Sequence, residues 1–270
     1  MHLQNLFSHR NRTLLRELVI TDFKLRYQGS ALGYLWSLVR PLFLFGILLV
    51  VFGYILKVGS NIPHYPIYLL LGIVLWSFFI EATNNGLQSI VNRGDLIRKI
   101  NFPKYIIVIS GTISALINLG ISLVVVFIFM FFAHIGVGWL ALILPLLIIE
   151  LYIFSLALAF FLAALYVNFR DIGYMWELIT QAGFYASAIL YPLSLVEAKS
   201  HFLAKLMLLN PVAQISQDAR YVLITPQTDT LLKLTHSWVI AFIPVIIILV
   251  IALASAVYFR KSSRSFAENV

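Results

Sequence analysis

The sequence predicts an all-α integral membrane protein with six transmembrane helices, an N-terminal amphipathic interface helix, and short outer re-entrant helices between spans five and six. Of its 270 residues, 61% are hydrophobic and only 11% are charged, whereas a typical soluble domain has about 25% charged residues. The apolar residues gather in segments long enough to cross the roughly 30 Å hydrocarbon core as helices of about 20 residues. A soluble globular protein, a disordered chain and a nucleic-acid binder are therefore disfavoured.

Five apolar segments reach the length of a span, namely 32–56, 65–90, 105–132, 139–167 and 238–259. A sixth segment, 175–191, is shorter and ends at Pro192. Six spans place both ends of the chain on one side of the membrane. One membrane domain is expected, comprising a cytoplasmic interface helix (1–30), spans one to five (32–191), outer gate helices (192–236), and span six with a cytoplasmic tail (237–270).

Basic residues indicate the orientation. They are frequent before span one, after span two and in the tail, and sparse in the two short connections on the other side. Because cytoplasmic loops carry an excess of Lys and Arg, both termini are expected in the cytoplasm. The first residues lack a compact apolar core with a small-residue cleavage site, so span one should be retained rather than removed as a signal.

Motifs for catalysis are absent from the sequence. The chain has no cysteine, which excludes disulfides and thiolate metal sites. It contains no GxxxxGK[ST] phosphate loop, no HExxH and no GxSxG, and its six histidines are scattered. We therefore expect no catalytic residue, no metal site and no cofactor on this chain.

The stretch 10–28 has helical composition and many charges. Leu14, Leu18 and Leu25 fall near one face, although Asp22 intrudes on its flank. This pattern predicts a helix in the cytoplasmic headgroup region with basic residues facing anionic lipid. Both a plain membrane anchor and a contact site for a cytoplasmic partner fit the pattern.

The segment 92–103, NRGDLIRKINFP, predicts a short amphipathic helix between spans two and three. Asp95 follows Gly94 as a candidate N-cap, and Pro103 bars continuation. Such a helix can dock into a groove on a cytoplasmic protein, and a basic loop that only obeys the charge rule is the alternative. The apolar face comprises Leu96, Ile97 and Ile100, and the basic face comprises Arg98 and Lys99.

The segment 192–236 is too long for a turn and too polar to cross lipid as one helix. Asn210 and Pro211 divide it into two helix-compatible runs. Backbone breaks at membrane depth are tolerated only where they are buried in protein or line a cavity. The segment is therefore expected to form either a gate or a simple outer cap.

Charged residues within the spans are few. Arg40 and Glu81 fall at nearly the same depth and are hypothesised to pair, because each alone is expensive in the membrane. The alternative is that Arg40 extends to the inner headgroups. Glu150 has no basic partner at its depth and is expected to be protonated or to face a polar cavity.

Aromatic residues cluster on the short fifth segment. Phe184, Tyr185 and Tyr191 lie beside the Asn-Pro break in the expected fold. Packing or interfacial belts are the ordinary role of such rings. Because sugars are often held on aromatic faces, we also consider that these rings line a path for a polysaccharide.

Several short motifs, in order along nearly the whole chain, resemble the permease subunits of ABC-2-type polysaccharide exporters, the family that moves O-antigen, capsular polysaccharide and wall teichoic acid. The first is the basic stretch before span one, TDFKLRYQGSALGYLWSLVRPL, at 21–42. The others are KINFP at 99–103, VNFRD at 167–171, LYP at 190–192 and LNP at 209–211.

The resemblance implies a homodimer in the bacterial cytoplasmic (inner) membrane that pairs with two copies of a separate ABC ATPase subunit. ATP and Mg would bind to that partner. The cargo would be a glycan linked to undecaprenyl diphosphate. The alternatives are an ABC-2 permease for a drug or lipid, a membrane enzyme acting on polyprenyl-linked sugars, and a proton-coupled carrier.

The resemblance also implies roles for particular residues. Those for ATPase coupling are Asp95, Leu96, Ile97, Arg98, Lys99, Ile100, Phe102, Arg170 and Asp171. Those for the channel and its substrate are Trp36, Arg40, Phe184, Tyr185 and Tyr191. Candidates for binding the diphosphate are Arg26, Arg40 and Arg98, and the expected gate residues are Pro192, Asn210 and Pro211.

Overall fold

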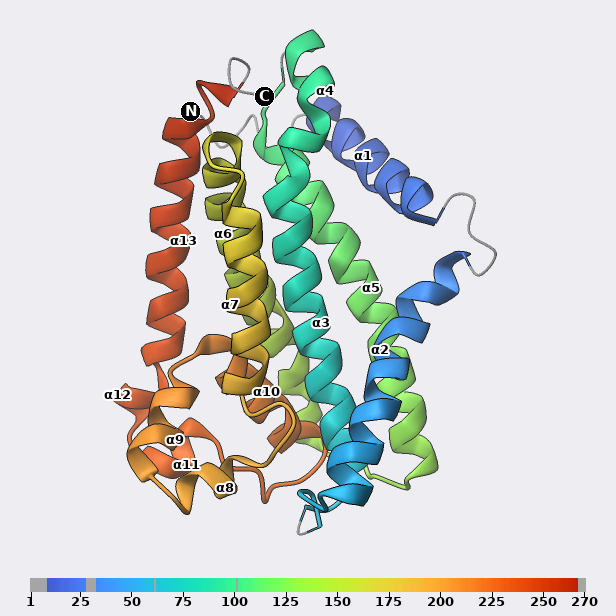
Figure 1. The fold of residues 1–270 in the computed structure, drawn as a ribbon, viewed down its shortest axis with the longest axis vertical. Coiled ribbons are helices and arrows are strands. Elements are labelled where there is room, and N and C mark those ends of the chain that lie inside the picture. Colours follow the sequence, from blue (N-terminus) through green and yellow to red (C-terminus); the bar gives the residue numbers. More distant parts are fainter. Residues whose placement is uncertain (1–8, 28–32, 61, 101, 267–270) are drawn as a thin grey trace.

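The computed structural model describes residues 9–27, 33–60, 62–100 and 102–266. This part of the chain is helical and contains no strand, which confirms the predicted fold class. Five helical segments are long and apolar enough to cross a membrane, and they form an elongated bundle (Figure 1). They run over Trp36–Ile55, Tyr65–Ser89, Tyr105–Phe132, Trp139–Asn168 and Trp238–Ser262.

The long helices begin where the sequence favours a helix start. Proline occupies the first turn of α3, α6 and α13, where its missing N–H has no partner to lose. In chain order the elements are α1 (His9–Tyr27), η2 (Gly33–Leu35), α2 (Trp36–Leu48), the π-helix η3 (Leu49–Ile55), α3 (Tyr65–Ser89), η4 (Val91–Arg93), α4 (Gly94–Lys99), α5 (Tyr105–Phe132), η5 (Trp139–Ile143), α6 (Leu144–Asn168), α7 (Ile172–Ala186), α8 (Leu193–Glu197), α9 (His201–Leu208), α10 (Pro211–Leu223), α11 (Leu231–Thr235), α12 (Trp238–Ala241) and α13 (Ile243–Ser262).

Helix α3 is the centre of the bundle. It packs against α5 and α6 along much of its length and also contacts α2, α7 and α10. Helix α2 lies at the edge of the bundle (Figure 1), and Phe45 is its one fully buried residue. Lipid tails are as apolar as leucine, so close helix packing in a membrane depends on small residues. Gly86 is such a small residue on α3, and it lies against Ala159 of α6.

Helix α7 differs from the predicted fifth span, 175–191. It begins earlier and ends at Ala186, after 15 residues, which at 1.5 Å per residue is about 22 Å and short of a full crossing. The chain nevertheless passes from one end of the bundle to the other here (Figure 1). Residues 187–190 complete the passage as buried, non-helical backbone, which is tolerated at membrane depth only inside protein.

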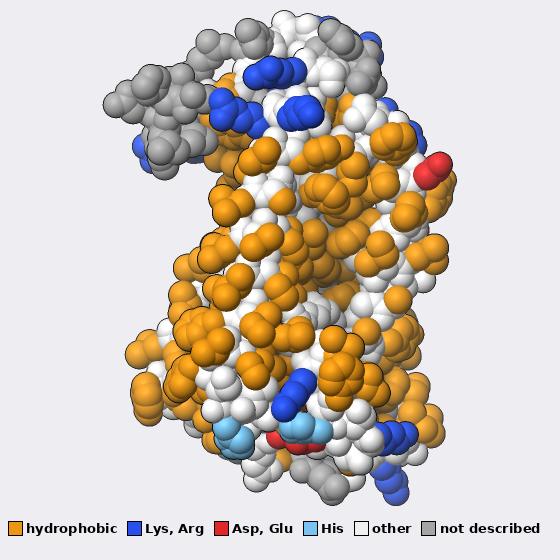
Figure 2. All heavy atoms as spheres, turned by 90° about the vertical axis from the view of Figure 1, so that its left-hand side faces the viewer, with side chains coloured by type: hydrophobic (Ala, Val, Ile, Leu, Met, Phe, Trp, Pro, Cys, Tyr) orange, Lys and Arg blue, Asp and Glu red, His pale blue; other side chains and the backbone are white. Residues whose placement is uncertain are grey.

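The two ends of the bundle are chemically different. Helix α1, α4, the α6–α7 turn and the C-terminal end of α13 lie at one end (Figure 1), which we call the basic end. Helices α8, α9, α11 and α12 lie at the other, which we call the cap end. Figure 2 shows apolar side chains covering the face between them, as a hydrocarbon surrounding requires. Exposed or half-buried basic residues at the basic end are Arg12, Arg16, Lys24, Arg93, Arg98, Lys99, Lys104, Arg170, Arg260, Lys261 and Arg264.

The segment between α7 and α13 is split as the sequence predicts. Asn210 and Pro211 separate α9 from α10. Helices α8 and α9 stay at the cap end, whereas α10 turns back into the bundle against α3, α6 and α13 (Figure 1). Residues 211–217 are all buried, so α10 is a re-entrant helix.

Replacing Gly86 with alanine should lower the unfolding temperature of the purified protein in detergent. An added Cβ would lie 2.3 Å from Cβ of Ala159 and 2.9 Å from its Cα, so α3 and α6 would have to separate, at about 1–3 kcal/mol. Gly120→Ala is the matched control, since no neighbouring atom lies within 4 Å of its added Cβ. Equal unfolding temperatures for Gly86→Ala and the wild type would contradict this packing.

Candidate functional site

Helix α4 forms the corner between α3 and α5 at the basic end. The prediction that Asp95 is the N-cap of α4 is wrong. The 3-10 turn η4 leads straight into the helix and places Arg93 at the cap position, without a side-chain cap hydrogen bond. Asp95 instead lies in the first turn. Its carboxylate there is still favourably placed near the positive end of the helix dipole.

The apolar residues of this corner divide between inside and outside. Ile97 is 6% exposed and Phe102 is 8% exposed, and both belong to a buried cluster with α1, α5, α6 and α13. Ile100 is 48% exposed. The predicted shared face of Leu96, Ile97 and Ile100 is therefore wrong, because the helix ends at Lys99 and Ile100 is already extended. Besides Ile100, the exposed side chains are Asp95, Arg98 and Lys99, and Leu96 is half-buried.

The α6–α7 turn presents a second charged surface at the same end. Arg170 and Asp171 are both exposed. The Arg170 guanidinium lies 5.2 Å from the centre of the Tyr166 ring, a cation–π distance. The structure thus keeps these two predicted coupling residues at the surface.

Helix α1 is tied to the bundle by an apolar and a polar contact. Leu18 is buried, and Leu14 and Leu15 pack beside it. Asp22, which interrupts the apolar stripe in the sequence, forms an ion pair with Arg93 of η4 and accepts a hydrogen bond from Ser110 Oγ at 3.3 Å. The side chains of Leu25 and Arg26 lie outside the described residues.

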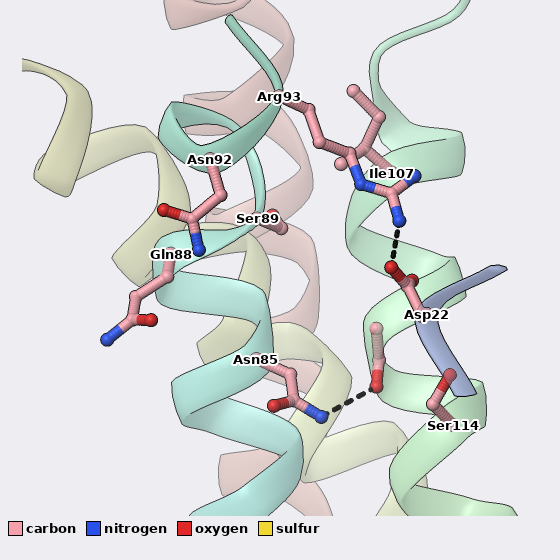
Figure 3. Close-up of a pocket in the computed structure, with 9 residues that line it drawn as sticks. Asp22, Asn85, Gln88, Ser89, Asn92, Arg93, Ile107 and Ser114 are labelled. Carbon is pink, nitrogen blue, oxygen red and sulfur yellow. Dashed lines mark hydrogen bonds and ion pairs between the residues drawn. The ribbon is translucent and has the colours of Figure 1, made fainter. Parts of the chain in front are cut away.

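This ion pair borders a polar cavity of about 380 Å³ between α1, α3 with η4, and α5 (Figure 3). Asn85 donates to the Gly111 carbonyl at 3.1 Å across its floor. Among the described residues, Nη1 of Arg93 is buried without a hydrogen-bond partner. The remaining polar side chains of the lining are Gln88, Ser89, Asn92 and Ser114.

The predicted pair of Arg40 and Glu81 is not formed. No ion pair joins these two side chains in the described part of the chain, and Glu81 Oε1 accepts a hydrogen bond from Asn118 at 2.7 Å. The physical reason is the position of α2 at the bundle edge, where Arg40 is exposed. Trp36, one turn earlier, is also exposed.

The three aromatic residues predicted for the channel take different positions near the end of α7. Phe184 is half-buried, with its ring centre 6.0 Å from that of Trp76. Tyr185 is exposed, and the Tyr191 hydroxyl donates to its carbonyl at 2.6 Å. Only the Tyr185 ring is largely open to the surroundings.

Arg220 of α10 is completely buried at the cap end. Its Nε donates to the Tyr68 carbonyl at 3.1 Å, and its two terminal nitrogens donate to the carbonyls of Ala188 and Ile189 at 2.9 and 2.7 Å. The guanidinium also lies 3.7 Å from the centre of the Tyr68 ring. One side chain thus joins α10, α3 and residues 187–190, an arrangement that we call the arginine clamp.

Neighbouring hydrogen bonds reinforce the arginine clamp. Tyr65 of α3 donates to the Leu190 carbonyl at 2.6 Å. Asn210 donates to Ser187 Oγ at 3.0 Å while its own Oδ1 caps α10 at Val212. The predicted gate residue Asn210 is therefore a structural tie, and Pro192 and Pro211 are buried beside it.

Glu150 lies against this re-entrant segment. It is half-buried on α6, which packs against α10. Gln214, one turn before Asp218, donates to the Asp218 carboxylate. Among the described residues, Glu150 Oε1 and Gln214 Oε1 are buried without a partner. That Glu150 is protonated or faces a polar cavity stays a prediction.

Comparison with known proteins identifies the family of this chain. Residues 13–224 match the ABC-2 type transporter family. The chain belongs to that family. The match runs from α1 to the end of α10, so it includes α4, the polar cavity and the arginine clamp of this ABC-2 transporter protein.

Individual relatives of this transporter protein cover most of its length. The O-antigen export system permease protein RfbA of Myxococcus xanthus is 31% identical over 205 residues, which are 76% of this chain and 77% of the relative. Two proteins of the same name from Klebsiella pneumoniae are 30% and 29% identical over 202 residues, 73% of this chain and 76% of theirs.

Sequence reasoning missed the arginine clamp and assigned no role to Arg220. A signal was present on α3. Gly72 lies in the middle of an apolar span, and a Cβ there would lie 2.2 Å from Nη2 of Arg220. A glycine within a membrane span is a recurrent sign of close approach by another group.

Replacing Arg220 with methionine should destabilise this ABC-2 transporter protein and expose residues 187–200 to protease. The carbonyls of Ala188 and Ile189 would remain buried without donors, at about 1–3 kcal/mol each. Gly72→Ala should also destabilise the wild type, yet have little further effect beside Arg220→Met, because the atom it clashes with is gone. Unfolding temperatures of the two single variants and the double variant measure this coupling, and additive losses would contradict the clamp.

Proposed function

We propose that this chain is the channel-forming permease subunit of an ATP-driven exporter that moves a lipid-linked polysaccharide (an O-antigen, capsule or teichoic acid) across the bacterial cytoplasmic membrane. The observation that carries the proposal is the similarity, over about three quarters of both chains, to proteins named as O-antigen export permeases. The family match over residues 13–224 includes α4 and the re-entrant helix α10.

The working unit is proposed to be two copies of this chain with two copies of an ABC ATPase, which binds the ATP and Mg. The sequence has no phosphate-binding loop of its own, which agrees with ATP binding on a partner. Helix α2 supports the second copy, because it is almost wholly apolar and exposed along the bundle edge. The dimer axis is proposed to lie along this edge.

The ATPase is proposed to contact the basic end through two surfaces. One comprises Ile100 with Asp95, Arg98 and Lys99, and the other comprises Arg170 and Asp171, all of them exposed. Ile97 and Phe102 anchor the α4 corner in the buried cluster beneath it. A force on Ile100 therefore acts directly on the ends of α3 and α5.

The cargo is proposed to be a glycan on undecaprenyl diphosphate, moving between two copies of α2 and α7 within the membrane lipid. Trp36 and Arg40 are exposed on one side of α2, four residues apart and thus on one face. Arg98 is exposed at the basic end, and together with Arg26 and Arg40 it is a candidate for the diphosphate. Tyr185 offers an open ring near the other end of α7.

The exit gate is proposed to be α8 and α9 rather than α10. The arginine clamp and Asn210 fix α10 and residues 187–190 to α3. Helices α8 and α9 lie outside that unit and expose Leu195, Phe202 and Leu206. The gate is thus assigned to the part of the segment 192–236 with the fewest ties to the bundle.

Single cysteines should label according to a cytoplasmic basic end. The chain has no cysteine, and Lys99 and Lys199 are exposed at opposite ends. In right-side-out spheroplasts, a membrane-impermeant maleimide should label Lys199→Cys at once and Lys99→Cys only after permeabilisation. The opposite order would reverse the proposed orientation, in which both termini are cytoplasmic.

The transport role is tested in a strain that lacks this chain and should keep its lipid-linked glycan inside the cell. The wild-type chain should restore the polysaccharide to the surface, as measured by antibody or lectin labelling of intact cells. Ile100→Glu should fail to do so and should not co-purify with the ATPase, because a charge replaces an apolar contact. Full glycan display in the strain without the chain would contradict the proposed function.

The matched control for this experiment is Leu195→Glu. Leu195 has the same 48% exposure as Ile100 but lies at the cap end, so the variant should still co-purify with the ATPase. Both variants should be obtained in wild-type yield, since neither side chain is buried. Equal loss of the ATPase from both variants would contradict the assignment of α4 as the coupling surface.

A further inference from the structure

The polar cavity at the basic end has the size and position of a ligand site. Its volume of about 380 Å³ lies within the range of about 300–1,000 Å³ usual for small-molecule sites. It is bounded by three elements from distant parts of the chain, α1, α3 with η4, and α5. Figure 3 shows Asn85, Gln88 and Asn92 on the α3–η4 side, with Asp22 and Ser114 across from them.

The lining carries no net charge. Asp22 and Arg93 are its two ionised residues, and they neutralise each other in an ion pair. The other polar groups are amides and hydroxyls, which both donate and accept hydrogen bonds. A diphosphate would bring its negative charges beside the Asp22 carboxylate and be repelled by it, whereas a sugar hydroxyl adds no charge. The chemistry therefore favours a neutral, hydroxyl-rich group.

One hydrogen-bond donor of a lining residue has no partner in the described part of the chain. Nη1 of Arg93 is buried and has no hydrogen-bond partner among the described residues. A buried donor without a partner is costly, so a shift of the Arg93 side chain that turned this nitrogen toward the cavity would be favoured by an oxygen atom bound there. The Asp22 carboxylate already holds the neighbouring Nη2, which fixes the direction in which Nη1 points.

A stripe of amides leads along α3 to the cavity. Asn84, Gln88 and Asn92 are spaced by four residues, so they share a face, and all three are exposed. The rest of α3 is largely buried apolar surface. Polar residues within membrane segments face cavities or other protein rather than lipid, and the stripe therefore marks a polar path that ends at Gln88 and Asn92 in the lining.

We infer that this cavity binds a sugar residue of the exported glycan. The inference rests on the proposed function and deepens it, because it separates a sugar subsite from the site of the lipid diphosphate. Its position gives the subsite a consequence. Arg93 directly precedes α4 and is paired with Asp22 of α1, so an occupied cavity acts on α4, which is proposed to face the ATPase.

The test uses the full complex of this chain with its ATPase in proteoliposomes. Two probes are compared, a short-chain polyprenyl diphosphate that carries one N-acetylhexosamine and the same polyprenyl diphosphate without the sugar. The concentration giving half-maximal stimulation of ATP hydrolysis is measured for each. The double variant carries Gln88→Leu and Asn92→Leu, both at exposed positions. The control is Gln227→Leu, an exposed amide that follows α10 and is not part of the cavity lining.

In the wild type and the Gln227→Leu control, the sugar-bearing probe should act at lower concentration than the bare lipid. The double variant should need about five- to tenfold more sugar-bearing probe, as expected from the loss of two modest hydrogen bonds, with its response to the bare lipid unchanged. A retained sugar preference, or an equal weakening for both probes, would overturn the sugar subsite. If neither probe stimulates the wild type, the proposed function itself fails.

Discussion

The fold of the outer half depends on one buried guanidinium. The helix of the fifth passage stops at Ala186, and the backbone that follows it has carbonyls at membrane depth that no helix satisfies. Arg220 supplies three donors in a rigid fork to the carbonyls of Tyr68, Ala188 and Ile189. A buried charge is costly unless polar groups compensate it, and here three carbonyls and the Tyr68 ring do so. The arginine and the broken helix therefore support each other.

Helix α3 connects the arginine clamp to the basic end of the molecule. Gly72 makes room for the arginine clamp near its start, and Gly86 lets α6 approach near its end. Just beyond α3, Arg93 holds α1 through Asp22. These two polar ties thus lie on or directly after one buried helix, and the apolar helices around it provide the surface toward lipid.

The spans were predictable from the sequence because length and apolar content alone define a membrane crossing. The end of α7 was not, because it is set by Arg220, 34 positions further along the chain. Ile97 and Ile100 have helical spacing, yet α4 is too short to keep them on one face. In the sequence Asp22 interrupts an apolar stripe, and only the fold reveals that it forms an ion pair with Arg93.

These constraints determine how a force at the basic end can reach the cap end. Helix α7 begins at the exposed Arg170–Asp171 turn and ends at residues 187–190, which the arginine clamp joins to α10. Packed helices respond by small rigid shifts rather than by gradual bending. In the proposed exporter, a push of the ATPase on that turn is therefore transmitted along α7 to α10 as one unit. Helices α8 and α9, attached to this unit at both of their ends, must move with it.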